Sequence, residues 1–168
     1  FTPAVFNNEN GFVSSADLVL SGAGEMEGGL QVAPWWSQQV DGRFNVRTTD
    51  GEIACFGGRL PFYSFTGSQG VTYTKGDLIR WAIVYRPSNL CEDNPGTIEY
   101  LLSYGGMDYT SGELAFSEGN PAEDPPYGLW GILNDARVGG YFQPFIDIGN
   151  PANMGRAEQE GIDYLFKL

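Results

Sequence analysis

The sequence predicts an all-β fold, an antiparallel two-sheet β-sandwich formed by a single domain over residues 1–168. Short apolar, aromatic-rich runs recur between Gly, Asn, Asp and Pro clusters, which is typical of strands joined by turns. The 24 Gly and 10 Pro residues interrupt almost every stretch long enough for three helical turns. A chain of 168 residues that is 42% hydrophobic can bury one substantial core.

The strongest predicted strand is Leu78–Tyr85, whose length and apolar density favour a central position in a sheet. Asp50-Gly51 predicts a hairpin between strands Arg43–Arg47 and Glu52–Phe56. Gly105-Gly106 predicts a second reversal of the chain. The other apolar runs predict strands at Phe12–Leu20, Leu30–Ala33, Leu60–Phe65, Val71–Tyr73, Thr97–Tyr104, Met107–Phe116, Tyr127–Leu133, Val138–Ile148 and Ile162–Phe166.

Three segments fall outside this pattern. Ser21–Gly29 has four glycines in nine residues and is expected to be a loop. Ser117–Pro126 is too rich in proline to be regular. Met154–Glu160 is the one short stretch that favours a helix.

Charge and composition exclude several functions. The 21 acidic and 9 basic residues give a formal charge of −12, which repels nucleic acid, anionic lipid and strongly anionic polysaccharides unless the basic residues gather in one groove. Histidine is absent, so the chain has no Ser-His-Asp triad and no His-based metal site. No apolar run approaches the about 20 residues of a membrane span, and no membrane insertion is expected.

The two cysteines, Cys55 and Cys91, allow two interpretations. In a secreted protein they are expected to form a disulfide that ties a strand to a loop. They could instead be two unrelated thiols, one buried and one on a loop. The acidic, turn-rich, lysine-poor composition favours an extracellular or surface-displayed protein, although no signal peptide is present at the start.

The order of four segments resembles the concanavalin A-like, laminin G-like jelly-roll superfamily. A Trp-containing strand comes first, then a strand opened by Gly-Thr, a hairpin, and a terminal Gly-Tyr-Phe…Ile-Asp strand. These segments are Gly76–Pro87, Gly96–Leu101, Gly105–Gly112 and Gly139–Asp147, roughly the second half of the chain. The resemblance implies a jelly-roll sandwich, and the superfamily includes lectins, carbohydrate-binding modules, glycoside hydrolases and polysaccharide lyases.

Two sets of residues are candidates for catalysis. Glu25 and Glu27 would project from one face of an extended strand, as paired carboxylates acting on a glycosidic bond require, although a solvated loop is the competing interpretation. Retaining hydrolases of the superfamily carry Glu-x-Asp-x-x-Glu, and this chain has no third acid there. A lyase would use Arg137, Tyr141 and Gln143, but alginate lyases of this fold carry Tyr-Phe-Lys where this chain has Gln143.

Carbohydrate binding has two candidate surfaces, because sugar rings stack on exposed aromatic rings while planar polar groups hold their hydroxyls. The competing interpretation of both surfaces is ordinary core and hairpin. Trp81 is assigned to the core. The first surface comprises Trp35, Trp36, Gln38 and Gln39, and the second comprises Trp130, Asn134, Asp135, Arg137, Tyr141 and Gln143.

The sequence therefore predicts recognition of a neutral or weakly charged glycan through one concave sheet face. A polysaccharide-active enzyme of the same fold and a structural module, such as a capsid protrusion or filament subunit, remain the alternatives. No cofactor is required, but Glu92-Asp93-Asn94 and Glu123-Asp124 could supply oxygen ligands to calcium.

Overall fold

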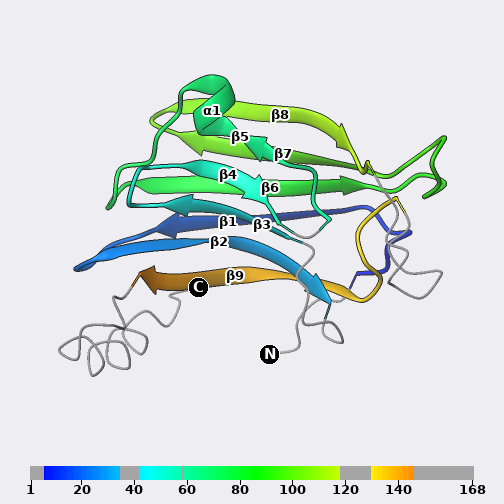
Figure 1. The fold of residues 1–168 in the computed structure, drawn as a ribbon, viewed down its shortest axis with the longest axis horizontal. Coiled ribbons are helices and arrows are strands. Elements are labelled where there is room, and N and C mark those ends of the chain that lie inside the picture. The colour runs from blue at the N-terminus through cyan, green and yellow to red at the C-terminus, as the bar shows by residue number, and fades with distance from the viewer. Residues whose placement is uncertain (1–5, 35–41, 58, 118–129, 146–168) are drawn as a thin grey trace.

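The computed structural model describes residues 6–34, 42–57, 59–117 and 130–145, which form two antiparallel sheets and one short helix (Figure 1). The predicted all-β, two-sheet sandwich is confirmed at this level. The elements are β1 (Phe12–Val19), β2 (Glu25–Pro34), β3 (Gly42–Arg47), β4 (Ile53–Phe56), β5 (Tyr63–Ser64), α1 (Phe65–Gln69), β6 (Leu78–Arg86), β7 (Thr97–Tyr104), β8 (Met107–Ala115) and β9 (Ala136–Phe145).

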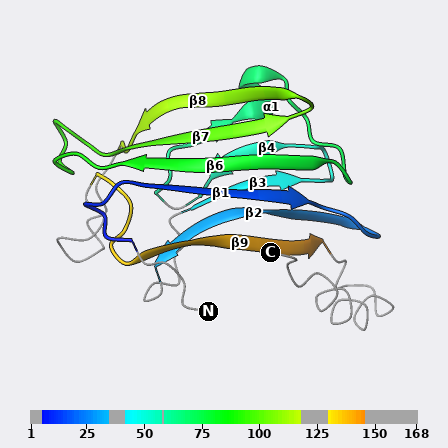
Figure 2. The same cartoon turned by 180° about the vertical axis from the view of Figure 1, so that it is seen from behind.

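The first sheet has four strands in the order β1-β6-β7-β8, and Figure 2 shows it in front. The predicted central position of β6 is confirmed, because β6 pairs with β1 on one side and β7 on the other. β7 and β8 form the hairpin predicted at Gly105-Gly106. Both glycines have positive φ, 61° and 80°, as a two-residue hairpin turn of type I′ requires.

The second sheet has five strands in the order β5-β4-β3-β2-β9. β3 and β4 form the hairpin predicted at Asp50-Gly51, where Gly51 has a φ of 73°. The pairing of β2 with β9 runs from Glu25 opposite Phe145 to Pro34 opposite Ala136. It places two segments more than 100 residues apart in the chain side by side, as Figure 1 shows for the blue and orange strands.

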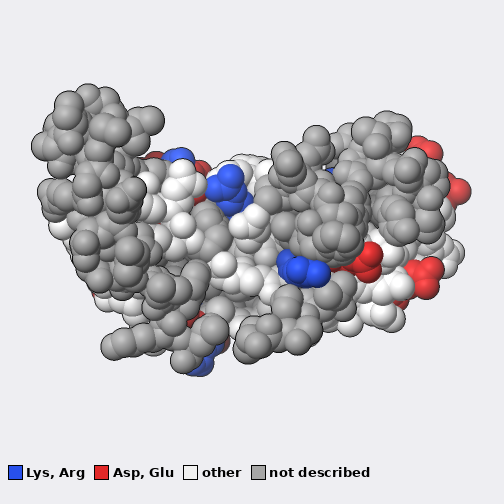
Figure 3. Space-filling model, turned by 90° about the horizontal axis from the view of Figure 1, so that it is seen from below, with Lys and Arg blue, Asp and Glu red and all other residues white. Residues whose placement is uncertain are grey.

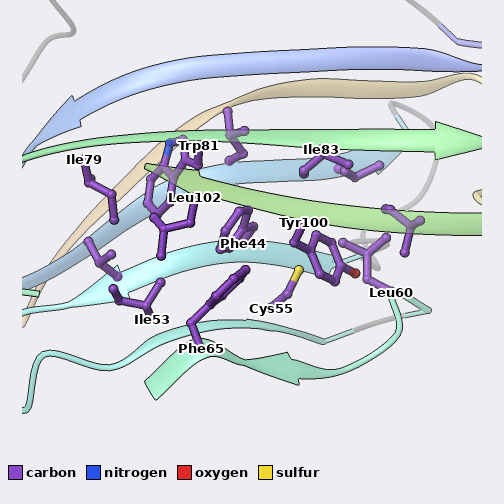
Figure 4. Close-up of a cluster of buried hydrophobic side chains, with 14 of the residues drawn as sticks. Phe44, Ile53, Cys55, Leu60, Phe65, Ile79, Trp81, Ile83, Tyr100 and Leu102 are labelled. Atoms are coloured by element: carbon purple, nitrogen blue, oxygen red, sulfur yellow. The ribbon is translucent and has the colours of Figure 1, made fainter. Parts of the chain in front are cut away.

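The two sheets enclose one apolar core, which Figure 4 shows in part. Period-two alternation supplies part of it, because alternate residues of β6 and most of β7 are buried. Trp81 lies at its centre, as predicted, with its ring 5.1 Å from that of Phe44 on the opposite sheet. Phe44 also stacks on Phe65 at 5.6 Å and approaches Tyr100 at 5.4 Å. Aromatic packing across the sheets therefore fixes how they face each other.

The predicted loop Ser21–Gly29 is wrong in its second half, since β2 begins at Glu25. Glycines usually weaken strands, and this is why the segment resembles a loop. Here Gly28 and Gly29 are paired on both sides, with Val46 and Asn45 of β3 and with Phe142 and Tyr141 of β9. Pairing with two neighbours compensates for the low strand propensity of glycine.

The predicted strand Leu60–Phe65 is also shorter than expected. Only Tyr63 and Ser64 pair with β4, and the helix α1 follows at once. Ser64 caps this helix by accepting a hydrogen bond from the Gly67 nitrogen at 2.9 Å, and Gly70 ends it with a φ of 70°. Ser64 and Gly70 flank the helix and are residues typical of a cap and a stop, a signal that the apolar pattern hides.

Two further predicted strands are absent from the described elements. Val71–Tyr73 is buried at Val71 and Tyr73, but its backbone bonds to Phe65 and Gly51 outside a ladder. Trp130–Leu133, the described part of Tyr127–Leu133, is turn and coil before β9. The Met154–Glu160 helix and the Ile162–Phe166 strand lie outside the described residues. Within the described residues, no helix is long and apolar enough to cross a membrane.

The expected Cys55–Cys91 disulfide is not formed. Cys55 is fully buried in the core on β4, whereas Cys91 is exposed in the loop between β6 and β7. Burial raises the pKa of the Cys55 thiol well above its ordinary value. The pair therefore matches the competing interpretation, with one inert core thiol and one surface thiol.

Candidate functional site

The surface of the five-stranded sheet that faces away from the four-stranded sheet is its outer face. Residues alternating with the core positions lie on it, since successive strand residues point to opposite sides. This face is largely polar, whereas the inner positions of the same strands are apolar. The outer positions are Arg137, Gly139 and Gln143 on β9, Glu25, Glu27, Gly29 and Gln31 on β2, Arg43, Asn45 and Arg47 on β3, and Ala54 and Phe56 on β4.

Glu27 is the centre of a polar network on the outer face. Arg43 Nη1 lies 2.8 Å from Glu27 Oε1, and Asn45 Nδ2 donates to Glu27 Oε2 at 3.2 Å. Only 7% of Glu27 and 3% of Asn45 is exposed. Burial of a carboxylate is costly unless it is hydrogen-bonded and paired, and here each Glu27 oxygen has its own donor.

The register shows how Arg43 reaches Glu27. Arg43 is opposite Gln31, and Glu27 lies four residues away along β2, a distance of about 13 Å at strand spacing. The Arg43 side chain must therefore run along the sheet over the Gly29–Asn45 pair. Its guanidinium carbon also lies 5.7 Å from the centre of the Phe56 ring. The cation is thus held between a carboxylate and an aromatic ring.

Gly29 lies beneath the Arg43 side chain in this network. A Cβ atom at Gly29 would lie 2.1 Å from the Phe44 carbonyl oxygen and 2.7 Å from the Asn45 Cα. No side chain fits at this position unless β2 and β3 separate. The glycine therefore permits the close approach of the two strands and leaves the space over which Arg43 extends.

Glu25 and Glu27 lie on the same face of β2, in the paired arrangement that the sequence suggested. Their surroundings differ, because Glu25 is exposed and accepts a hydrogen bond from the Thr48 hydroxyl, whereas Glu27 is buried. The alternative of a solvated loop is wrong for both, since both belong to the β2 ladder. The nearby Arg47 is bound to Asp50 and Glu52, and its hydrogen bonds hold the pKa of the Asp50 carboxyl below its usual value.

Strand β9 brings a second set of predicted residues to the same face. Gln143 pairs directly with Glu27 in the β2–β9 register, and Arg137 pairs with Ala33 near the other end. Gln143 is exposed and Arg137 is half-buried. The backbone of Tyr141 pairs with Gly29, and the structure describes only the backbone of this residue. The hydrolase pair and two of the three lyase residues therefore share one surface, which sequence spacing alone does not reveal.

The other predicted site residues are elsewhere. Asn134 and Asp135 are in the turn before β9, where Asn134 Oδ1 accepts from the Asn8 nitrogen at 3.3 Å. The Trp130 carbonyl accepts from the Gly96 nitrogen at 2.7 Å. These contacts join loops at one end of the sandwich, away from the centre of the outer face. Trp35, Trp36, Gln38 and Gln39 lie outside the described residues.

The sequence analysis missed Gln31, Arg43 and Asn45. A signal was present, because Arg43-Phe-Asn-Val-Arg47 alternates polar and apolar residues with a period of two. That pattern shows that Arg43, Asn45 and Arg47 share the polar face of a strand. It does not show which strands lie beside them, and so their link with Glu27 could not be foreseen.

Charges on the outer face are largely balanced. Arg43 and Arg47 are both bound to carboxylates. Arg137 is the third arginine on this face among the described residues. In Figure 3 the visible basic side chains stand apart, and the acidic ones gather toward one end of the view. Within the described ranges, no three His, Cys, Asp or Glu side chains are placed to hold a metal ion. Of the two proposed calcium clusters, Glu123-Asp124 falls outside those ranges.

Comparison with protein-family models, curated proteins and solved structures finds no match for this chain. The chemistry of the outer face is therefore the basis for a function.

Proposed function

We propose that the protein recognises carbohydrate through the outer face of its five-stranded sheet. The observation that carries the proposal is the network of Glu27, Arg43 and Asn45, in which a carboxylate, a guanidinium and an amide are fixed on adjacent strands. Sugar hydroxyls both donate and accept hydrogen bonds, and the partly exposed Arg43, whose orientation Glu27 fixes, can donate to them without reorganising.

Neighbouring residues extend this surface in a way that suits a glycan. Gln31 and Gln143 add amides on either side of the network, and Gln143 is exposed. The Phe56 ring borders it beside Arg43. The fold supports the proposal only by resemblance, since an outer sheet face is where a jelly-roll of the concanavalin A-like type would offer a binding surface. A neutral or weakly charged glycan fits best, because two outer-face arginines are already bound to carboxylates.

A polysaccharide-active enzyme of the same fold is the second candidate, and the placement of Glu25 and Glu27 favours it. One acid is exposed and one is buried on the same strand face, and different surroundings are what give two carboxylates different roles. Against it, both carboxylate oxygens of Glu27 are already engaged, one by Arg43 and the other by Asn45.

A structural module is the third candidate. Val13, Val19 and Leu78 are exposed on β1 and β6, at the outer side of the four-stranded sheet. Such residues could contact other subunits in an assembly. The acidic composition alone supports the related proposal that the protein is secreted or displayed at a surface.

A glycan and polysaccharide array, run with calcium and with chelator, tests these candidates together. The same wells are then assayed for new reducing ends and for the absorbance of unsaturated uronates. Binding without product supports recognition, and product in any well supports an enzyme. A Glu25→Gln, Glu27→Gln double variant should still bind, and loss of a measured cleavage in it would favour the hydrolase. No signal in any channel, together with self-assembly in solution, would support the structural module.

Trp35 and Trp36 remain predictions from the sequence alone. Replacing one by Ala should abolish glycan binding, and replacing the other should impair folding. If both variants fold and bind as the parent does, neither residue belongs to the binding surface.

A further inference from the structure

We propose that Arg137, with Gly139 and Gln31, forms a subsite for a single carboxylate on the bound glycan, so that the preferred ligand contains an acidic sugar within an otherwise neutral chain. The inference rests on the proposed carbohydrate recognition and names the ligand class more closely. It comes from the hydrogen bonding of Arg137 and from the space beside it on β9.

Arg137 differs from the other described arginines in its partners. Those at positions 43, 47, 80 and 86 each form an ion pair with a carboxylate. Arg59 donates to the Gly131 carbonyl. Within the described ranges Arg137 has no ion pair, and its Nε is buried without a hydrogen-bond partner.

That arrangement is unexpected in a chain with 21 acidic and 9 basic residues, where a carboxylate partner should be easy to provide. A buried donor without an acceptor costs about 1–3 kcal/mol, and such costs are often found where a ligand completes the bonding. The Nε of the half-buried Arg137 therefore still lacks an acceptor among the described residues.

The space beside Arg137 is open. Gly139 is two residues further along β9 and so lies on the same face, and a Cβ added there would have no atom within 4 Å. Gly139 is opposite Gln31, which in turn is opposite Arg43. A sugar ring above Gly139 would thus lie between Arg137 and the Gln31–Arg43 pair, which borders the Glu27 network.

A carboxylate is the group that best fits this position. Its two oxygens accept two parallel hydrogen bonds from the planar guanidinium, and the Gln31 amide can donate to a ring hydroxyl nearby. The formal charge of −12 opposes a polyanion but is compatible with one isolated carboxylate. A sulfate ester has related chemistry, and the test separates the two anions.

The test uses printed glucan, xylan, galactan and mannan oligosaccharides, each carrying one uronic acid, beside their carboxyl-reduced and sulfated counterparts. The full chain, Arg137→Gln and Arg80→Gln are compared. Arg80 is exposed on the four-stranded sheet and paired with Asp17, so its variant makes the same change in net charge away from the outer face.

We expect the parent to bind at least one uronic acid glycan about tenfold more tightly than its reduced form, as a charge-assisted pair allows. Arg137→Gln should lose this preference while still binding the neutral glycan, and Arg80→Gln should keep it. Gly139→Val, which fills the open space and leaves the guanidinium in place, should also lose the preference; Gly139 does not have a positive φ, so the strand can accept valine.

Equal binding of acidic and reduced glycans, or a preference that survives in both Arg137→Gln and Gly139→Val, would overturn the carboxylate subsite while leaving carbohydrate recognition intact. Tighter binding of the sulfated form would also overturn it. Binding of no glycan at all would contradict the proposed function itself.

Discussion

Arg43 and Glu27 form an ion pair of 2.8 Å although they are not opposite each other in the sheet. The guanidinium reaches the carboxylate over the Gly29–Asn45 pair, and the Asn45 amide donates to the second oxygen. Four residue types at fixed register positions therefore make one unit. Its geometry depends on the close approach of β2 and β3 at Gly29.

Gly29→Ala should destabilise the fold by about 3 kcal/mol, as overpacking of a closely packed site does. The added Cβ would lie 2.1 Å from the Phe44 carbonyl oxygen. The matched control is Gly139→Ala, where a Cβ meets no atom within 4 Å and the free energy of unfolding should stay the same or rise slightly. Urea unfolding measures both variants. Equal unfolding midpoints would mean that β2 and β3 are not this close.

Glu27→Ala should lower the free energy of unfolding by about 2 kcal/mol, because it removes a buried partner from Arg43 and Asn45. Glu113→Ala is the control, since Glu113 is exposed and lies 3.5 Å from Arg86. Its loss should cost less than about 0.5 kcal/mol. Chemical denaturation of the two variants gives the comparison, and a loss at Glu27 no greater than at Glu113 would show that the network does not stabilise the fold.

The two thiols should differ in reactivity. Cys91 is exposed and should react at once with a thiol reagent, whereas Cys55 is buried and should react only after unfolding. Burial raises the pKa of the Cys55 thiol, which further lowers its reactivity in the native state. The reaction is followed by absorbance, without reductant. If the native protein gives no reactive thiol and its mass is lower by two hydrogens, the cysteines are bonded after all.

The free energy of unfolding should fall in acid, partly because Glu99 becomes protonated. The hydrogen bond from the Thr110 hydroxyl, and then the interaction with Arg86, lower the pKa of this carboxyl in the native state. A group whose native pKa is lowered contributes stability above its unfolded pKa, and this contribution disappears as the pH falls through the native pKa. NMR titration of the Glu99 carboxyl should show the lowered pKa. In Thr110→Val the pKa should rise toward the ordinary value, and an unchanged pKa would contradict the assigned cause.

The fold class could be predicted because local patterns determine it. The length and apolar density of Leu78–Tyr85 predict β6, and the turns at Asp50-Gly51 and Gly105-Gly106 predict two hairpins, all of which the fold contains. The predicted loop over 21–29 is wrong from Glu25 on, because glycine usually weakens strands, whereas here Gly29 allows the β3 backbone to lie close beside it. Local sequence does not report such long-range packing.

The candidate site could be predicted only in part for the same reason. Glu25 and Glu27 were recognised as a pair from their spacing, and Arg137 and Gln143 from a resemblance. That they occupy one face follows from the register of β2 with β9, which no spacing in the sequence specifies. Arg43 and Asn45 reach Glu27 through the β2–β3 register, which is equally long-range information.

The most direct test of the central claim is an NMR titration that follows the side-chain amides during addition of a glycan identified on the array. Recognition by the outer face predicts shifts at the Gln31, Asn45 and Gln143 amides. It predicts none at Asn89, which is exposed in the loop between β6 and β7, or at Gln69, whose amide donates to Tyr63 and Thr110. Gln143→Ala should weaken binding, and Asn89→Ala should not. Shifts confined to Gln69 or Asn89, with the outer-face amides unchanged, would contradict the account.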